Sequence, residues 1–220
     1  MLRHRAPDLL IILLLLLLPL IVFAPQTLGG RTLLPVDNLY QWEPFAAYRE
    51  VVGAPEVPHN ALLSDLILEN YVWKQFIRQS IAEGEIPLWN PHLFAGVPFL
   101  AAGQHSALYP LSLIFYILPL AAAYGWYTVI QLWLAGVCMY LLARGLGQRR
   151  AGATVAAVSW QLSGFFLARI VFPMMIGGAA WLPLLLLMAE YVIRSQPLFG
   201  RPAAAPWAAG GALTLGLVVY

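Results

Sequence analysis

The sequence predicts an all-α integral membrane protein. Of its 220 residues, 61% are hydrophobic and only 10% are charged, and its mean hydropathy is +0.75. Soluble globular chains are about 45–50% apolar and about 25% charged. Several apolar runs are also long enough to cross a bilayer as helices. The single cysteine, Cys138, lies in one of these runs, so the sequence indicates neither a disulfide framework nor a cysteine-based metal site.

Residues 1–24 predict a cytoplasmic N-terminus followed by a first transmembrane helix. Leu9–Ala24 is almost unbroken Leu and Ile, and three basic residues precede it: Arg3, His4 and Arg5. The hydrophobic region of a signal peptide has the same pattern. An uncut anchor is favoured because further apolar runs follow. In both cases the basic end stays in the cytoplasm and the next segment is exported.

The last part of the chain, residues 124–220, predicts transmembrane helices 2 to 4 and the start of helix 5. The apolar runs are Gly125–Ala143, Ala151–Ala168, Met174–Ile193 and a run that begins at Pro206. Because the sequence stops inside that last run, at Tyr220, we expect it to be the N-terminal fragment of a longer polytopic protein. Arg194 and Arg201 should lie on the cytoplasmic side.

Residues 107–123 predict re-entrant or interfacial helices. Pro110 and Pro119 leave only about two turns of uninterrupted helix between them. Basic clusters near span ends are normally cytoplasmic. If this segment crossed the bilayer fully, the densest basic cluster of the chain would instead lie on the external side of the membrane. That cluster consists of Arg144, Arg149 and Arg150.

The segment between the first two spans, residues 25–106, predicts a folded extracytoplasmic loop. It holds four basic residues (Lys and Arg) and eight acidic residues (Asp and Glu), whereas the rest of the chain holds eight basic and two acidic residues. The basic residues elsewhere are scattered at the ends of apolar runs, so a nucleic-acid partner is not indicated. The loop is too long for a plain connector, and its many Trp and Pro residues are not typical of a disordered linker.

An amphipathic helix is expected within this loop at about residues 61–83. Ser64 would cap its start and Gly84 would stop it. From Val72 onward, Trp73 lies on the apolar face of this helix, and Lys74 is assigned to the polar face. Such a helix would lie flat on the outer leaflet.

Asp65, at the start of this helix, is the first candidate catalytic acid. Asp65 and Glu69 are four residues apart, so both carboxylates project from one side. A carboxylate there could accept a proton from a hydroxyl or coordinate a divalent cation. The alternative is an ordinary acidic first turn of a helix. Asp37 is a second candidate, although Asp37-Asn38 is also a common turn pair.

Other polar side chains have simpler alternatives. His59, His92 and His105 match no local ligand spacing, so a hydrogen-bonding role is favoured over a three-histidine metal site. Arg169, at the outer end of a span, could bind a phosphate or could reach the headgroups by snorkelling.

Several short motifs occur in the order Asn60–Asp65, Trp73-Lys74, Gly84–Pro91, Gly96–Phe99, Gln104–Leu111 and Trp181–Leu184 with nearby Glu190. Together they resemble the bacterial YfhO-like membrane protein family, over roughly residues 31–194. The most specific stretch is Gly84–Pro91, which reads Gly-Glu-Ile-Pro-Leu-Trp-Asn-Pro.

That family is similar to the GT-C superfamily of membrane glycosyltransferases. The resemblance implies a GT-C-like helical bundle in the bacterial plasma membrane, with Asp65, or second Asp37, as the key acid. It implies a polyprenyl-phosphate-linked sugar donor and an envelope polymer, glycolipid or protein as acceptor, with membrane lipids around the spans. The candidate substrate-binding residues are Glu69, Trp89, Asn90, Gln104, His105 and Arg169; packing of the loop is the alternative role for Trp89, Asn90 and Gln104.

Two other functions stay open. A transporter or flippase of lipid-linked material would be expected to carry ionisable residues near the midplane of its spans. These spans have almost none, and Glu190 lies near a cytoplasmic end. A noncatalytic scaffold with an exported interaction loop is the third interpretation.

Overall fold

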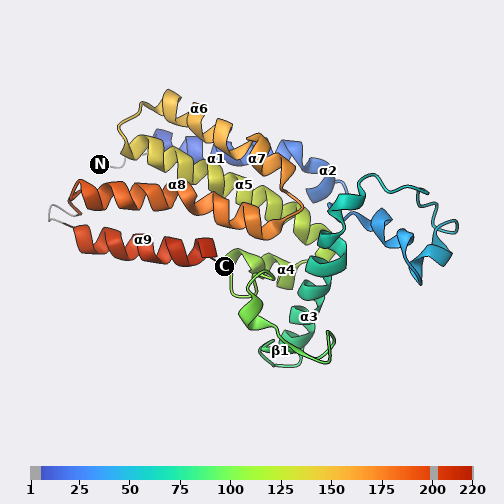
Figure 1. Cartoon of the computed structure of the whole chain (residues 1–220). Helices are drawn as coiled ribbons and strands as arrows, with labels where there is room; N and C mark the ends of the chain where they lie inside the picture. The colour runs from blue at the N-terminus through green and yellow to red at the C-terminus, as the bar shows by residue number, and fades with distance from the viewer. Residues whose placement is uncertain (1–5, 199–202, 220) are drawn as a thin grey trace.

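The computed structural model describes residues 6–198 and 203–219 and is mostly helical, at 68%. Long helices lie side by side in a bundle, and a loop region, residues 28–119, covers one end of it (Figure 1). This confirms the predicted all-α class. Several residues used in the topology argument lie outside the described residues: Arg3, His4, Arg5, Arg201 and Tyr220.

Three helical segments are long and apolar enough to cross a membrane, namely Leu120–Gly145, Arg150–Ala168 and Pro173–Ile193. The first is α5 and the third is α8. The middle segment consists of α6 (Arg150–Gln161) and α7 (Gly164–Ala168). At about 1.5 Å per residue, the 26 residues of α5 extend for about 39 Å, which exceeds the roughly 30 Å of a bilayer's hydrocarbon core.

Shorter helices complete the bundle. The apolar α1 (Ala6–Val22) packs against α5, and α9 (Ala204–Val219) packs against α8. The predicted apolar run Leu9–Ala24 does not form one helix, because a turn at Phe23 separates α1 from the short α2 (Ala24–Thr27).

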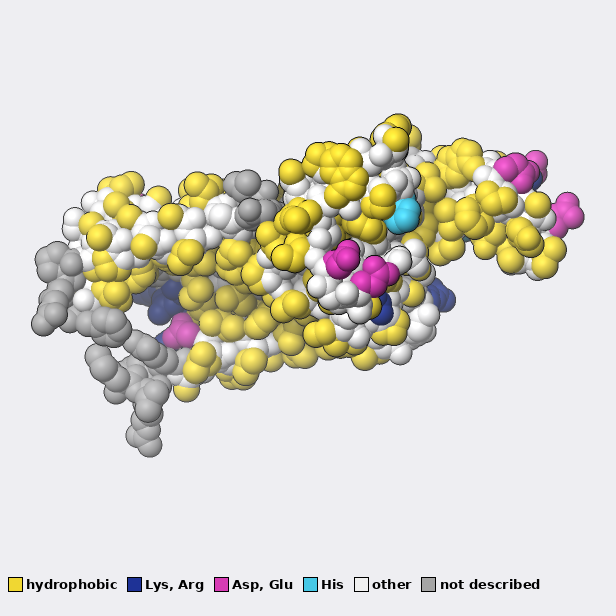
Figure 2. All heavy atoms as spheres, turned by 90° about the horizontal axis from the view of Figure 1, so that it is seen from below, with side chains coloured by type: hydrophobic (Ala, Val, Ile, Leu, Met, Phe, Trp, Pro, Cys, Tyr) yellow, Lys and Arg dark blue, Asp and Glu magenta, His cyan; other side chains and the backbone are white. Residues whose placement is uncertain are grey.

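The bundle has two chemically different ends. At the loop end, α5 and α8 begin and α7 terminates. At the arginine end, α5 terminates at Gly145 and α6 begins at Arg150. Figure 2 shows hydrophobic side chains over much of the visible bundle, whereas acidic side chains gather on the loop region.

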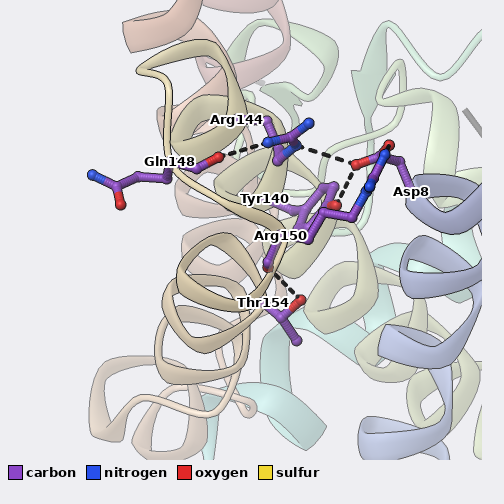
Figure 3. A network of polar contacts seen from close by, with 6 residues as sticks. All are labelled: Asp8, Tyr140, Arg144, Gln148, Arg150 and Thr154. Atoms are coloured by element: carbon purple, nitrogen blue, oxygen red, sulfur yellow. Dashed lines mark hydrogen bonds and ion pairs between the residues drawn. The ribbon is translucent and has the colours of Figure 1, made fainter. Parts of the chain in front are cut away.

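A network of polar contacts ties three helices together at the arginine end (Figure 3). Asp8 of α1 accepts hydrogen bonds from Tyr140 Oη at 2.6 Å and Arg144 Nε at 3.1 Å. Its second carboxylate oxygen lies 2.9 Å from a terminal nitrogen of Arg150. The starts of α1 and α6 and the last turns of α5 therefore lie at the same end of the bundle.

Close approach of the helices depends on glycines in α5 and α8. A Cβ at Gly136 would lie 1.9 Å from Gln161 Oε1, and one at Gly177 would lie 2.8 Å from Tyr127 Oη. By contrast, Gly164, the first residue of α7, has nothing within 4 Å of its Cβ position.

The expected boundary at residues 107–123 is corrected by the structure. Only two short helical pieces form before Leu118: η7 (Pro110–Ser112) and α4 (Leu113–Ile117). The last four residues, 120–123, instead form the first turn of α5, directly after Pro119. Proline ends α4 because it cannot continue its hydrogen-bond ladder, yet it fits well at the start of the next helix.

The helix expected at about residues 61–83 is also built differently. It consists of the 3-10 turn η4 (Ala61–Leu63), the π-helix η5 (Leu66–Asn70) and the α-helix α3 (Tyr71–Ala82). Asn60, not Ser64, caps the start, because its side chain accepts a hydrogen bond from the Leu62 amide. Gly84 stops α3 as predicted, with a φ of +76°.

The rest of the loop region forms two extensions. The first contains the 3-10 helices η2 (Val36–Gln41) and η3 (Phe45–Tyr48) and projects away from the bundle (Figure 1). The second is the lobe, residues 84–107, which carries a two-residue antiparallel ladder and the 3-10 helix η6 (Leu100–Ala102). In that ladder, β1 (Trp89–Asn90) pairs with β2 (Val97–Pro98).

Candidate functional site

The two candidate acids, Asp65 and Glu69, lie at the start of the composite helix formed by η4, η5 and α3, and they face a common cavity at the loop end. This acid cavity has a volume of about 190 Å³. One wall comes from the composite helix and the other from the start of α8 and the chain just before it. The lining residues are Asp65, Leu66, Glu69, Asn70, Trp73, Gln104, Val171, Phe172, Pro173, Met174 and Met175.

The π-helix sets the orientation of the two acids. Leu66, Ile67 and Asn70 are buried against the bundle, whereas Asp65 and Glu69 stay exposed. Residues four apart project from one side of a helix, so the two carboxylates share the acid cavity. π-helical turns are rare and are found frequently at functional sites.

The wall opposite the acids is held in place by the bundle. Phe172 precedes α8, Pro173 is its first residue, and Ile176 one turn later is completely buried. On the helix side, Asn70 accepts a hydrogen bond of 2.8 Å from Tyr124 Oη of α5. Because both walls are anchored to the spans, the acid cavity lies on a rigid part of the loop region.

Gln104 joins the acids from the lobe, and Trp73 lies beside them. Both residues also line a neighbouring pocket of about 120 Å³. An amide and an indole N–H can bind hydroxyl groups, and an indole face can pack against the apolar face of a sugar ring. The acid cavity therefore combines a candidate general base with groups suited to a polyhydroxylated substrate.

His105 has a packing role next to this site. Its Nε2 donates to the Phe99 carbonyl at 2.7 Å, and its Nδ1 accepts from the Ala107 amide at 3.1 Å. The ring also stacks on Phe99, with centroids 4.1 Å apart. Burial lowers the pKa of His105, so a neutral ring with both nitrogens occupied is favoured.

Lys74 is a buried residue that the sequence interpretation placed wrongly on the polar face. Its side chain is only 1% exposed. Nζ donates to the His105 carbonyl at 2.5 Å and approaches Ser112 Oγ at 3.4 Å. It also lies 4.6 Å from the centre of the Phe115 ring. Burial lowers the pKa of Lys74 to about 7.

Lys74 connects the acid-bearing helix to the segment that carries Gln104. A signal for its burial is present in the sequence, because Ile67, Asn70, Lys74 and Ile77 follow helical spacing. All four are buried. The interpretation missed this stripe because it began its face at Val72, downstream of the π-helical turn.

Asp37, the second candidate acid, makes structural contacts. One carboxylate oxygen accepts a hydrogen bond from the His59 amide at 2.8 Å and lies 2.9 Å from His59 Nδ1. The bond from the amide lowers the pKa of Asp37. The adjacent Asn38 donates to the Asn60 carbonyl at 3.1 Å. Asp37 thus fixes the first extension and is not among the residues that line the acid cavity.

Three other predicted site residues also lie outside the acid cavity. Trp89 is 54% exposed and lines a separate hollow of about 220 Å³ between α3 and the lobe. Asn90 is buried and accepts a hydrogen bond of 2.9 Å from the His92 amide. Arg169 lies at the end of α7, with its guanidinium 4.7 Å from the centre of the Phe165 ring.

The predicted residues therefore separate into two groups. Asp65, Glu69 and Gln104 come together in one cavity, whereas the others pack the loop region or, like Arg169 at the end of α7, lie elsewhere on the molecule. Among the residues described, no three His, Cys, Asp or Glu side chains are placed to hold a metal ion.

Comparison with known protein families, curated proteins and solved structures finds no match to this chain.

Proposed function

We propose that this chain belongs to a membrane glycosyltransferase of the GT-C type. It would transfer a sugar from a polyprenyl-phosphate-linked donor to an acceptor in the cell envelope. The observation that carries this proposal is the pair of carboxylates, Asp65 and Glu69, in one cavity at the loop end of an apolar bundle. The resemblance to the YfhO-like family supports the same assignment.

The size and position of the acid cavity favour this substrate class. Its volume of about 190 Å³ is below the roughly 300–1,000 Å³ of pockets for drug-sized ligands, so it suits a group as large as one sugar ring. One wall belongs to the start of the span α8. A donor with a lipid tail would reach this position from the bilayer, and a polar acceptor would reach it from the aqueous side.

In the proposed reaction, Asp65 acts as the general base. It removes the proton from the acceptor hydroxyl, whose oxygen then attacks the anomeric carbon of the sugar. The bond between that carbon and the phosphate oxygen breaks, and the lipid phosphate leaves with the bonding electrons. Glu69 and Gln104 would bind sugar hydroxyls, and Trp73 would pack against the ring.

The proposed location is the bacterial plasma membrane, with the arginine end in the cytoplasm. Basic residues near span ends favour the cytoplasmic side, and Arg144, Arg149 and Arg150 lie at the arginine end. The acid cavity would then face the extracytoplasmic side, together with the loop region.

The alternative of a transporter is less well supported by the spans. The acidic and basic residues of the spans and of the shorter helix α1 lie near the arginine end: Asp8 in α1, Arg144 in α5, Arg150 in α6 and Glu190 in α8. A transport path would be expected to place ionisable groups near the midplane instead.

Substitution of the acids tests the proposed function. In membranes that contain the full-length protein, we expect Asp65→Asn to lower sugar transfer from the polyprenyl-phosphate donor by about 10²–10⁴-fold, the usual contribution of a general base. Glu69→Gln should chiefly weaken substrate binding. The matched control is Glu83→Gln, because Glu83 is exposed at the far end of α3 and does not line the acid cavity. Full transfer by Asp65→Asn at normal abundance would contradict the assignment.

A further inference from the structure

A second hollow lies on the other side of the same helix, where α3 meets the first turn of α5. This arginine hollow is open and has a volume of about 670 Å³. Residues two apart in a helix point in widely different directions, so Tyr71 and Gln75 face away from Trp73 and the acid cavity. The lining residues are Tyr71, Gln75, Arg78, Gln79, Pro119, Leu120 and Ala121.

The lining of the arginine hollow favours an anion. Arg78 is its one charged residue among those described, and no acid lines it. One terminal nitrogen of Arg78 donates to the Leu118 carbonyl at 3.0 Å, which fixes the guanidinium beside α5. A guanidinium has five N–H donors, so the remaining ones can bind oxygens of a ligand.

Neighbouring side chains add further donors. Tyr71 Oη accepts a hydrogen bond from Gln75 Nε2 at 3.1 Å, so its own O–H can donate to a ligand. Glu83, one turn beyond Gln79, accepts a hydrogen bond from Gln79 Nε2 at 3.0 Å. The Glu83 carboxylate, which lies next to the arginine hollow, is therefore already hydrogen-bonded to the neutral side chain of Gln79.

The depth of the arginine hollow in the membrane indicates which anion is available to bind there. Because α5 is about 9 Å longer than the roughly 30 Å hydrocarbon core, its ends extend into the headgroup region. Leu120 and Ala121, which form one wall of the hollow, are the first two residues of α5. Lipid phosphates lie at this level, and arginine binds phosphate oxygens through two parallel hydrogen bonds.

We propose that the arginine hollow binds the phosphate of an anionic phospholipid, with Arg78 as the principal ligand-binding residue. No acidic side chain lines the hollow to pair with the ammonium group of choline, so phosphatidylglycerol is preferred over phosphatidylcholine. The lipid fixes α3 against the start of α5. This inference does not depend on the proposed glycosyltransferase activity.

Retention of lipid by the purified full-length protein tests the proposal. Native mass spectrometry after titration with phosphatidylglycerol or phosphatidylcholine should show preferential retention of phosphatidylglycerol. Arg78→Gln should weaken this retention about tenfold or more, which corresponds to about 1.4 kcal/mol. Gln75→Glu should also weaken it, because it adds a negative charge to the hollow while leaving the Arg78–Leu118 bond in place. The control Arg49→Gln makes the same change in net charge on the exposed first extension and should retain lipid normally.

Two results would overturn the proposal. The first is unchanged phosphatidylglycerol retention in both Arg78→Gln and Gln75→Glu. The second is displacement of the bound lipid by an equal concentration of inorganic phosphate, which would show that the hollow binds free phosphate. Unfolding temperatures of all variants distinguish a local loss of binding from a loss of fold, and the exposed Gln75 position keeps the test usable if Arg78→Gln is unstable.

Discussion

At the scale of single residues, the largest departure from the sequence interpretation is Lys74. A helical wheel that begins at Val72 places Lys74 with exposed polar residues, but the π-helical turn at Leu66–Asn70 rotates the upstream part of the helix relative to α3. The buried stripe of the composite helix therefore passes through Lys74. Asp65 and Glu69 could be predicted to face one side because their spacing holds in either type of helix.

The titration of Lys74 leads to a prediction about pH. Its pKa is lowered by burial to about 7 in the folded protein, against about 10.4 for an exposed lysine. Between these values the unfolded chain binds more protons, so the free energy of unfolding rises as the pH rises. Between pH 7 and pH 9 we expect the wild type to gain stability relative to Lys74→Met, by up to about 1.4 kcal/mol per pH unit.

Thermal unfolding of both proteins in detergent at pH 6.5 and pH 9 measures this effect. Parallel pH dependences of the two unfolding temperatures would show that Lys74 keeps an ordinary pKa. The residual pH dependence of Lys74→Met reports the other titrating groups near this position, His105 included.

At the scale of elements, a proline and a glycine marked two helix ends of the loop region, although the cap predicted at Ser64 and the boundary predicted at residue 123 were wrong. Pro119 and Gly84 both mark boundaries that the structure contains. The π-helix and the partners of Asp37 could not be predicted, because they depend on contacts between residues distant in the chain. The hydrogen bonds of Asp37 to His59, for example, join residues 22 positions apart.

The end of α3 gives a second stability prediction. Gly84 has a φ of +76° and donates to the Ile81 carbonyl, while Glu85 donates to the Ser80 carbonyl. A Cβ in this left-handed conformation costs roughly 1–2 kcal/mol. We expect Gly84→Ala to lower the free energy of unfolding by about this amount. Gly164→Ala is the control, because Gly164 is at the start of α7 with open space around its Cβ position; an equal loss in both variants would contradict the argument.

At the scale of the whole molecule, the apolar composition and the run lengths predicted a helical membrane protein. The structure adds which segments lie at each end. Asp8, Arg144 and Arg150 meet at the arginine end, and the acid cavity lies at the loop end. In the proposed transferase, these two ends face opposite sides of the membrane, with the acid cavity on the extracytoplasmic side.

Cysteine labelling measures this separation directly. The native Cys138 is buried and should not react with a membrane-impermeant maleimide. A cysteine in place of the exposed Gln148, between α5 and α6, should react only in inverted vesicles if the arginine end is cytoplasmic. A cysteine in place of Phe94, which is 93% exposed in the lobe, should react in intact cells whose outer barrier has been made permeable. Because α5 joins the two ends as one continuous helix, labelling of both positions from the same side would mean that it does not cross the bilayer, and the proposed route of a lipid-linked donor to Asp65 would fail with it.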